Sequence, residues 1–177
     1  MNDGLIDSLR HNTWASRELL TMCQDLTEPQ LQTTATGTHG SIIATFRHLI
    51  RSEAGYYWRL TGDEPQWLQI ADDAPDIDEL MRRNDDLAAR WDRFLEMPFD
   101  AERTFAYNWN DGNVRDVPAG VVLAQVIHHG SDHRSQICTI LTTLGVTIPA
   151  MGLWDYAEVT NRARQRDAQA TLEVAGQ

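Results

Sequence analysis

Histidines are concentrated in one short stretch of this chain, residues 128–133, with the sequence HHGSDH. If the stretch is helical, residues four apart share a face, which pairs His129 with His133 and His128 with Asp132. Neutral imidazole is a common ligand of zinc, nickel, copper and iron, and two imidazoles one helical turn apart can hold the same ion. The spacing therefore indicates part of a metal site.

The residues around the two pairs distinguish them. The face of His129 and His133 is apolar on both sides, apart from Gln136. Its other members are Val122, Val126, Ile140 and Leu144. The face of His128 and Asp132 continues through polar residues, namely Gln125, Ser135, Thr139 and Thr142. We expect the first pair to face the core, where buried imidazoles need a metal ion or hydrogen-bond partners, and the second pair to face solvent.

A third ligand must come from another part of the chain, where the remaining histidines are His11, His39 and His48. His48 lies in a segment, Ser41–Leu60, whose apolar spacing predicts a helix. Its neighbours along its own face are small and leave room for an ion: Ala44, Thr45, Ser52 and Gly55. His11 lies near the start of the first predicted helix and His39 in a loop rich in threonine and glycine, so both are predicted to be surface residues. The sequence thus favours His48 as the third ligand.

Together these histidines form a motif with two neighbouring polar residues. The motif consists of His48 on an early helix, followed by His129, His133, Arg134 and Gln136 in the pattern His-x-x-x-His-Arg-x-Gln. It resembles the motif of the DinB/YfiT-like family of metal-binding four-helix bundles, and the resemblance spans nearly the whole chain. Gln125 stands where many relatives carry a further, non-ligand histidine. The resemblance implies one DinB-like domain over residues 1–177, with metal ligands His48, His129 and His133.

Hydrophobic residues recur at helical spacing in four long segments, which predict the elements that position the histidines. The predicted helices span residues 4–26, 41–60, 76–97 and 118–144. Alternating residues at 104–109 and 114–117, around an Asn-Asp-Gly-Asn turn, predict a short β-hairpin, and a further helical segment begins near Ala150. We therefore predict an all-α four-helix bundle with a short β-hairpin and an additional C-terminal helix. The metal hypothesis requires the helices of His48 and His129 to be neighbours.

Local signals mark the ends of these helices. The step Thr27–Pro29 is predicted to end the first helix, because proline removes a backbone donor. Ser41 is a predicted N-cap of the second helix, and Asp76 with Glu79 resembles a capping box for the third. In the fourth helix, proline 118 suits the first position and glycine 145 follows the last apolar turn.

The chain carries a formal net charge of −11, and all 15 of its basic residues are arginine. An acidic surface repels phosphate backbones and anionic lipids, so neither nucleic acid nor a membrane is an expected partner. Without lysine, a Schiff base and a P-loop lysine are excluded. The sequence lacks the features of a signal peptide or a membrane span, so we expect a cytoplasmic protein in which Cys23 and Cys138 are reduced core residues.

Three histidine ligands leave at least one coordination position open, which is the pattern of catalytic rather than structural zinc. An ion in such a site lowers the pKa of a bound water or thiol. Gly130 stands where a His-Glu-x-x-His protease carries its glutamate base, which argues against that class. Ser52 and Gln136 are candidates for hydrogen-bonding the outer nitrogens of the ligands. Zinc and nickel are the expected metals.

The family resemblance implies a more specific chemistry. Characterised relatives include thiol-dependent S-transferases, which implies a metal-dependent transferase that takes a low-molecular-weight thiol and an electrophile as its small-molecule partners. The arginine-only composition slightly favours mycothiol, and the family implies a homodimer. Two alternatives remain open: a metal-dependent hydrolase, and a non-catalytic metal-binding or stress protein in which His39 or Glu53 supplies a fourth ligand.

Overall fold

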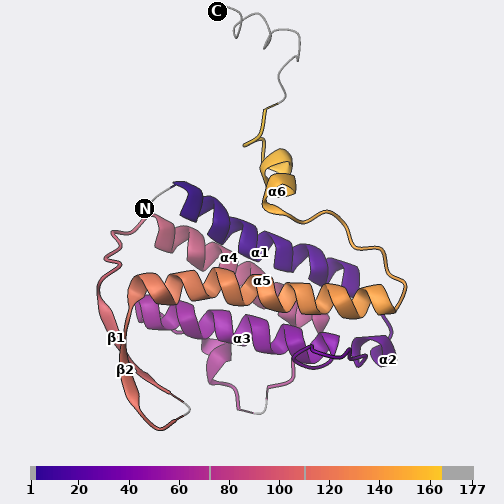
Figure 1. Ribbon diagram of the computed structural model, residues 1–177, viewed down its shortest axis with the longest axis horizontal. Coiled ribbons are helices and arrows are strands. Elements are labelled where there is room, and N and C mark those ends of the chain that lie inside the picture. Colours follow the sequence, from indigo (N-terminus) through magenta and orange to yellow (C-terminus); the bar gives the residue numbers. More distant parts are fainter. Residues whose placement is uncertain (1–2, 72, 110, 165–177) are drawn as a thin grey trace, which may run out of the picture.

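The computed structural model describes residues 3–71, 73–109 and 111–164 (Figure 1). Its long helices are α1 (Asp3–Cys23), α3 (Ile42–Thr61), α4 (Ile77–Leu95) and α5 (Ala119–Thr143). The shorter elements are α2 (Glu28–Leu31), the 3-10 helix η1 (Gln66–Gln69), strands β1 (Thr104–Asn108) and β2 (Val114–Pro118), and α6 (Leu153–Val159). The prediction of an all-α four-helix bundle with a short β-hairpin and an additional C-terminal helix is confirmed.

The long helices follow the order α1, α4, α3, α5 around the bundle, because α1 and α3 each pack against both α4 and α5. Figure 1 shows α5 in front, between α1 and α3, with α4 behind. The helix of His48, α3, and the helix of His129, α5, are therefore neighbours, as the metal hypothesis requires.

Large apolar side chains from all four long helices fill the centre of the bundle. Trp91 and Phe46 are the largest fully buried ones, and leucines and isoleucines surround them: Leu9, Leu19, Leu20, Ile42, Leu49, Ile50, Leu80, Leu87, Leu123 and Ile137. Burying one such side chain stabilises the fold by about 1.5–3 kcal/mol. The apolar faces predicted from periodicity thus hold α3 and α5 together. No helix in the described part of the chain combines the length and hydropathy needed to cross a membrane.

Several helix ends follow the local signals in the sequence. Ser41 Oγ accepts a hydrogen bond from the Ala44 backbone N–H at 3.3 Å. Asp76 Oδ1 accepts one from the Glu79 backbone N–H at 2.8 Å. Gly145 follows α5 with a φ of 76°, in the left-handed region that favours glycine. Ser41 places the start of α3, and with it the position of His48 along the bundle.

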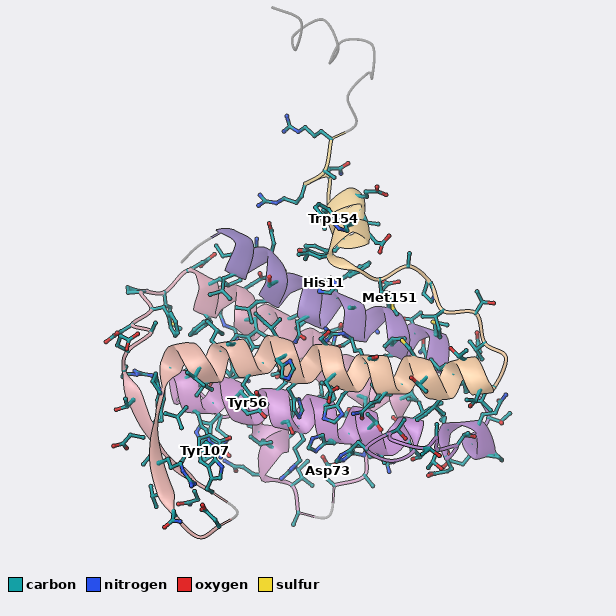
Figure 2. The ribbon with its side chains drawn as sticks, viewed as in Figure 1. His11, Tyr56, Asp73, Tyr107, Met151 and Trp154 are labelled. Carbon is teal, nitrogen blue, oxygen red and sulfur yellow. The ribbon has the colours of Figure 1, made fainter. Side chains whose placement is uncertain are left out.

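Two sequence predictions about the N-terminal part of the chain are wrong: the residue at which the first helix ends and the exposure of His11. α1 ends at Cys23 instead of residue 26, and the step Thr27–Pro29 begins the short helix α2, because proline is tolerated in the first turn of a helix. His11 is half-buried instead of exposed, and its Nε2 lies 2.8 Å from the Met151 carbonyl oxygen (Figure 2). This contact ties the segment before α6 to α1. α6 itself begins at Leu153, a little later than predicted.

The β-hairpin is antiparallel, with Tyr107 opposite Arg115. It extends from one end of the bundle and leads directly into α5 (Figure 1). An Arg103 guanidinium N–H donates to the Leu60 carbonyl oxygen at 2.6 Å, which ties the base of the hairpin to the last turn of α3. The hairpin is therefore attached to both helices that carry the predicted ligands.

Candidate metal centre

The three predicted ligands meet between α3 and α5. His48 Nε2 lies 3.0 Å from His129 Nε2, although the two residues are 81 positions apart in the chain. The ring centroid of His133 is 4.3 Å from that of His129 and 4.8 Å from that of His48. His133 is buried and the other two are half-buried, while His128 and Asp132 are exposed. The bundle therefore gathers imidazoles from two helices into one cluster.

The chemistry of this cluster fits a divalent ion. Two nitrogens bound tetrahedrally to zinc at about 2.0–2.1 Å lie about 3.3 Å apart, close to the separation of His48 and His129. Burial is the main cause that lowers the pKa of each of these two imidazoles to about 4, and the neighbouring histidines add to it. Both rings are therefore neutral near pH 7, the form in which imidazole binds metal. Without an ion, the two Nε2 atoms share a single hydrogen bond between opposite tautomers.

A fourth histidine, His39, joins the cluster from the loop before α3. Its ring stacks on that of His48 with centroids 4.1 Å apart, and lies 5.2 Å from the ring of His133. One ligand nitrogen from each of these three residues lies within 4.8 Å of the other two. The side chain is exposed, as predicted, but the prediction that it is an ordinary surface residue is wrong. Sequence periodicity could not reveal this, because His39 lies outside any helix.

The Gln136 side chain holds one ligand in a defined tautomer. Its Oε1 accepts from the His39 backbone N–H at 3.0 Å, and its Nε2 donates to Asp132 Oδ2 at 3.2 Å. These two contacts fix the orientation of the amide, so the same Oε1 must also accept from His133 Nδ1, which lies 3.0 Å away. The proton of His133 is therefore on Nδ1, and the lone pair on Nε2 remains available to an ion.

Glu53 is not placed to be a ligand. It is buried, and its two carboxylate oxygens accept hydrogen bonds from Asn12 Nδ2 at 3.0 Å and Trp91 Nε1 at 2.8 Å. Burial is the main cause that raises its pKa. Because each oxygen already has a partner in the core, the structure removes Glu53 from the candidates for a fourth ligand and leaves His39.

Arg134 and Gly130, inside the histidine motif, have structural roles on the side of α5 that faces α1. An Arg134 guanidinium N–H donates to Asn12 Oδ1 at 2.7 Å and lies 3.2 Å from Ser16 Oγ. A Cβ atom at position 130 would collide with Asn12 Oδ1. Glycine at position 130 therefore allows α1 and α5 to approach closely enough for Asn12 and Arg134 to bond.

One member of the cluster, His48, lines a cavity of about 470 Å³ on the side of the hairpin. Its lining includes Arg51, Ser52, Tyr56, Arg59, Glu64 and Tyr107. Ser52 lies one helical turn after His48, and Tyr56 lies one turn further, with its ring edge-on to that of His129 at 5.6 Å. The sequence pattern along the face of His48, continued one turn beyond Ser52, would have predicted Tyr56 as a residue of the site. Arg51 and Arg59, three and eleven positions after His48 on α3, lie beside or on the same face, whereas Tyr107 comes from the hairpin, which no pattern on α3 predicts.

Comparison with known proteins agrees with the motif and the fold. The model of the DinB family matches residues 1–168. The chain belongs to the DinB family. Comparison with curated proteins gave no match.

Among solved structures, the chain is similar to YfiT from Bacillus subtilis, described as a probable metal-dependent hydrolase with an unusual four-helix bundle topology. The TM-score is 0.59 and the identity 19%, over 82% of this chain and 88% of that chain. At this identity the likeness shows the fold of this DinB-family protein.

Proposed function

We propose that this DinB-family protein is a metal-dependent S-transferase in which a low-molecular-weight thiol is the nucleophile. The observation that carries the proposal is a histidine cluster in which the His48 and His129 rings are neutral and His48 lines a cavity of about 470 Å³. We assign His48, His129 and His133 as ligands of one zinc or nickel ion. Gln136 orients His133, and Ser52 lines the approach to His48.

The lining of the cavity favours a thiol over water as the nucleophile. When bound, a divalent ion lowers the pKa of a coordinated thiol or water and so supplies a nucleophile near neutral pH. An ordinary thiol has a pKa of about 8.5, far below that of water, so the thiol needs much less help from a protein base. Of the described residues that line the cavity, Glu64 is the only carboxylate, and its Oε2 accepts a hydrogen bond from Gln69 at 3.0 Å.

The protein's own groups would bind and orient two small molecules beside the cluster. Arg51 and Arg59 offer positive charge at the cavity wall, and Tyr56 presents its ring next to His129. In the transfer, the sulfur forms a bond to an electrophilic carbon, the leaving group departs with the electron pair of its broken bond, and the thiol proton passes to solvent. Mycothiol is the first thiol to test, because the arginine-only composition slightly favours it.

Metal content, measured by mass spectrometry on tag-free protein, tests the ligand assignment. We expect stoichiometric zinc or nickel in the wild type and loss of the metal in His48→Ala, His129→Ala and His133→Ala. The matched control is His128→Ala, which removes an exposed histidine from the same helix and should keep the metal. If the wild type binds neither ion even after reconstitution, the assignment is wrong.

The reaction is tested with the metal-loaded protein, a low-molecular-weight thiol and a halogenated aromatic electrophile. Metal-dependent release of halide that requires the thiol supports the transferase. Turnover of an ester or amide without any thiol supports the hydrolase instead, which is the activity named for the structural neighbour YfiT. His48→Ala should abolish either activity if the histidine cluster carries it.

The position of His39 favours a second candidate, a non-catalytic metal-binding protein. If His39 binds as a fourth ligand, the site is closed and resembles structural zinc. X-ray absorption of the zinc-loaded protein would then report four nitrogen neighbours and no bound water, and His39→Ala would reduce the nitrogen count to three. Three nitrogens and an exchangeable water in the wild type exclude this candidate.

A further inference from the structure

A second pocket, of about 370 Å³, lies between the β-hairpin and α5. It is walled by aromatic and aliphatic side chains, which are Tyr56, Tyr107, Trp109, Val117, Val121 and Val122. Trp109 and Val121 are 46% and 56% exposed, so large apolar side chains face open space here. Pockets of this size and composition are typical of small-molecule sites.

This hairpin pocket adjoins the cavity beside His48. Tyr56 and Tyr107 line both spaces, one from α3 and the other from the hairpin (Figure 2). Tyr56 touches the ring of His129 edge-on, and Gln125, one turn before His129 on α5, also lines the hairpin pocket. A small molecule long enough to occupy both spaces would therefore lie across Tyr56, next to His48 and His129.

The cavity on the other side of the two tyrosines carries positive charge, in a chain whose formal net charge is −11. Arg51 donates one N–H to the Leu68 carbonyl oxygen at 3.0 Å, and Arg59 donates one to that of Gly55 at 3.1 Å. The Arg59 guanidinium lies over the Tyr107 ring at 4.6 Å, which fixes it at the boundary of the two spaces. A guanidinium has five N–H donors, so both side chains retain donors for an anion.

We propose that the electrophilic substrate is an aromatic compound with an anionic group, a carboxylate or a sulfonate. Its ring occupies the hairpin pocket, its anion binds Arg59 and Arg51, and the carbon between them lies beside Tyr56 and the histidine cluster. The assignment of this molecule as the substrate rests on the proposed function. Binding of the anionic aromatic compound depends only on the side chains that line the hairpin pocket and the cavity beside His48.

Calorimetric titration of the full chain with naphthalene-2-sulfonate tests the inference, in the metal-loaded and the metal-free protein. We expect saturable binding of this probe, with weaker binding of its uncharged analogue 2-naphthalenemethanol and of methanesulfonate, which lacks the ring. Arg59→Gln and Arg51→Gln should each weaken the sulfonate by roughly tenfold or more and leave the uncharged analogue nearly unchanged. Arg93→Gln, which removes an exposed arginine from α4, is the control.

The apolar half is tested with Val121→Glu, which places a charge in the hairpin pocket at a position exposed enough to tolerate it. It should weaken both aromatic probes by roughly tenfold or more. Val159→Glu, the same change at an exposed position of α6, should leave them unaffected.

Failure of a metal-loaded wild type to bind the sulfonate, or equal binding by all variants, overturns the inference and leaves the proposed function standing. Binding of the sulfonate by a wild type that cannot be loaded with zinc or nickel would instead support the binding site and contradict the proposed function.

Discussion

At the scale of single residues, the Gln136 amide links His133 to the loop that carries His39. Its oxygen accepts from both residues, and its nitrogen donates to Asp132. A histidine held in one tautomer and one orientation loses less freedom when it binds an ion, so such partners raise metal affinity. His39 depends on the same amide through its backbone.

Gln136→Ala is therefore expected to weaken zinc binding by about 10–100-fold without abolishing it. The three assigned ligands remain, but His133 can rotate or change tautomer and the His39 loop loses its tie. Competition with a chromophoric chelator measures the affinity. Ser135→Ala, at the exposed neighbouring position, is the control. An affinity that stays within about twofold of the wild type would show that Gln136 does not orient a ligand.

At the scale of elements, α1 and α5 come into close contact at Gly130, where α5 has no side chain. Gly130 leaves the space that Asn12 and Arg134 occupy, and a Cβ atom there would collide with the amide oxygen of Asn12. Glycine inside a helix normally costs about 1 kcal/mol relative to alanine. Here the close contact between helices outweighs that local preference.

Gly130→Ala is accordingly expected to lower the free energy of unfolding by about 1–3 kcal/mol, as overpacking does, despite the better helix propensity of alanine. The comparison is Gly55→Ala on α3, where the new Cβ would meet only the flexible end of Arg59. That change should be neutral or stabilising by up to about 1 kcal/mol. Urea titration of both variants measures the difference. A stabilised Gly130→Ala protein would contradict the close approach of α1 and α5.

At the scale of the whole molecule, a buried polar network joins all four long helices. Glu53 on α3 accepts from Trp91 on α4 and from Asn12 on α1, and Asn12 in turn accepts from Arg134 on α5. The network lies beside the candidate metal centre, because Arg134 directly follows His133. The helices that carry the proposed ligands are thus held by polar contacts as well as by the apolar core.

The pH dependence of stability should show the protonation of Glu53. Burial raises its pKa above the ordinary 4.5. As pH rises past that value, the unfolded chain releases the proton and the folded chain retains it, so the folded state loses relative stability. The free energy of unfolding of the wild type, minus that of Glu53→Gln, should fall as pH rises from about 4.5. Exposed Glu96→Gln is the control, and a rising difference would contradict the assignment.

Metal removal should also act on the whole fold, because the assigned ligands join α3 to α5. A ligand that binds only the folded state stabilises it by about 2.7 kcal/mol at 100 times its dissociation constant. Chelation with EDTA should lower the urea midpoint of the wild type by a corresponding amount. His133→Ala should show no such response. Equal sensitivity of the two proteins would place the metal elsewhere.

The sequence by itself determined the helices, most of their caps, the hairpin and the pairing of His129 with His133. Each of these depends on interactions within a few residues: periodic apolar positions, a capping side chain, a tight turn. His48 could be predicted as a ligand because the periodicity of its own helix showed which residues share its face. The metal hypothesis added the expectation that the helices of His48 and His129 are neighbours.

Only the tertiary structure decided which distant groups meet. His39 is on a loop, whose direction no periodicity specifies, so its stacking on His48 follows from how the loop packs. Glu53 was a reasonable ligand candidate until the order of helices around the bundle placed it against Asn12 and Trp91. The hairpin likewise gains a role only because it packs beside α3, where the Tyr107 ring contacts the Arg59 guanidinium. Contacts between segments far apart in the chain depend on the whole packing arrangement, which local sequence patterns do not specify.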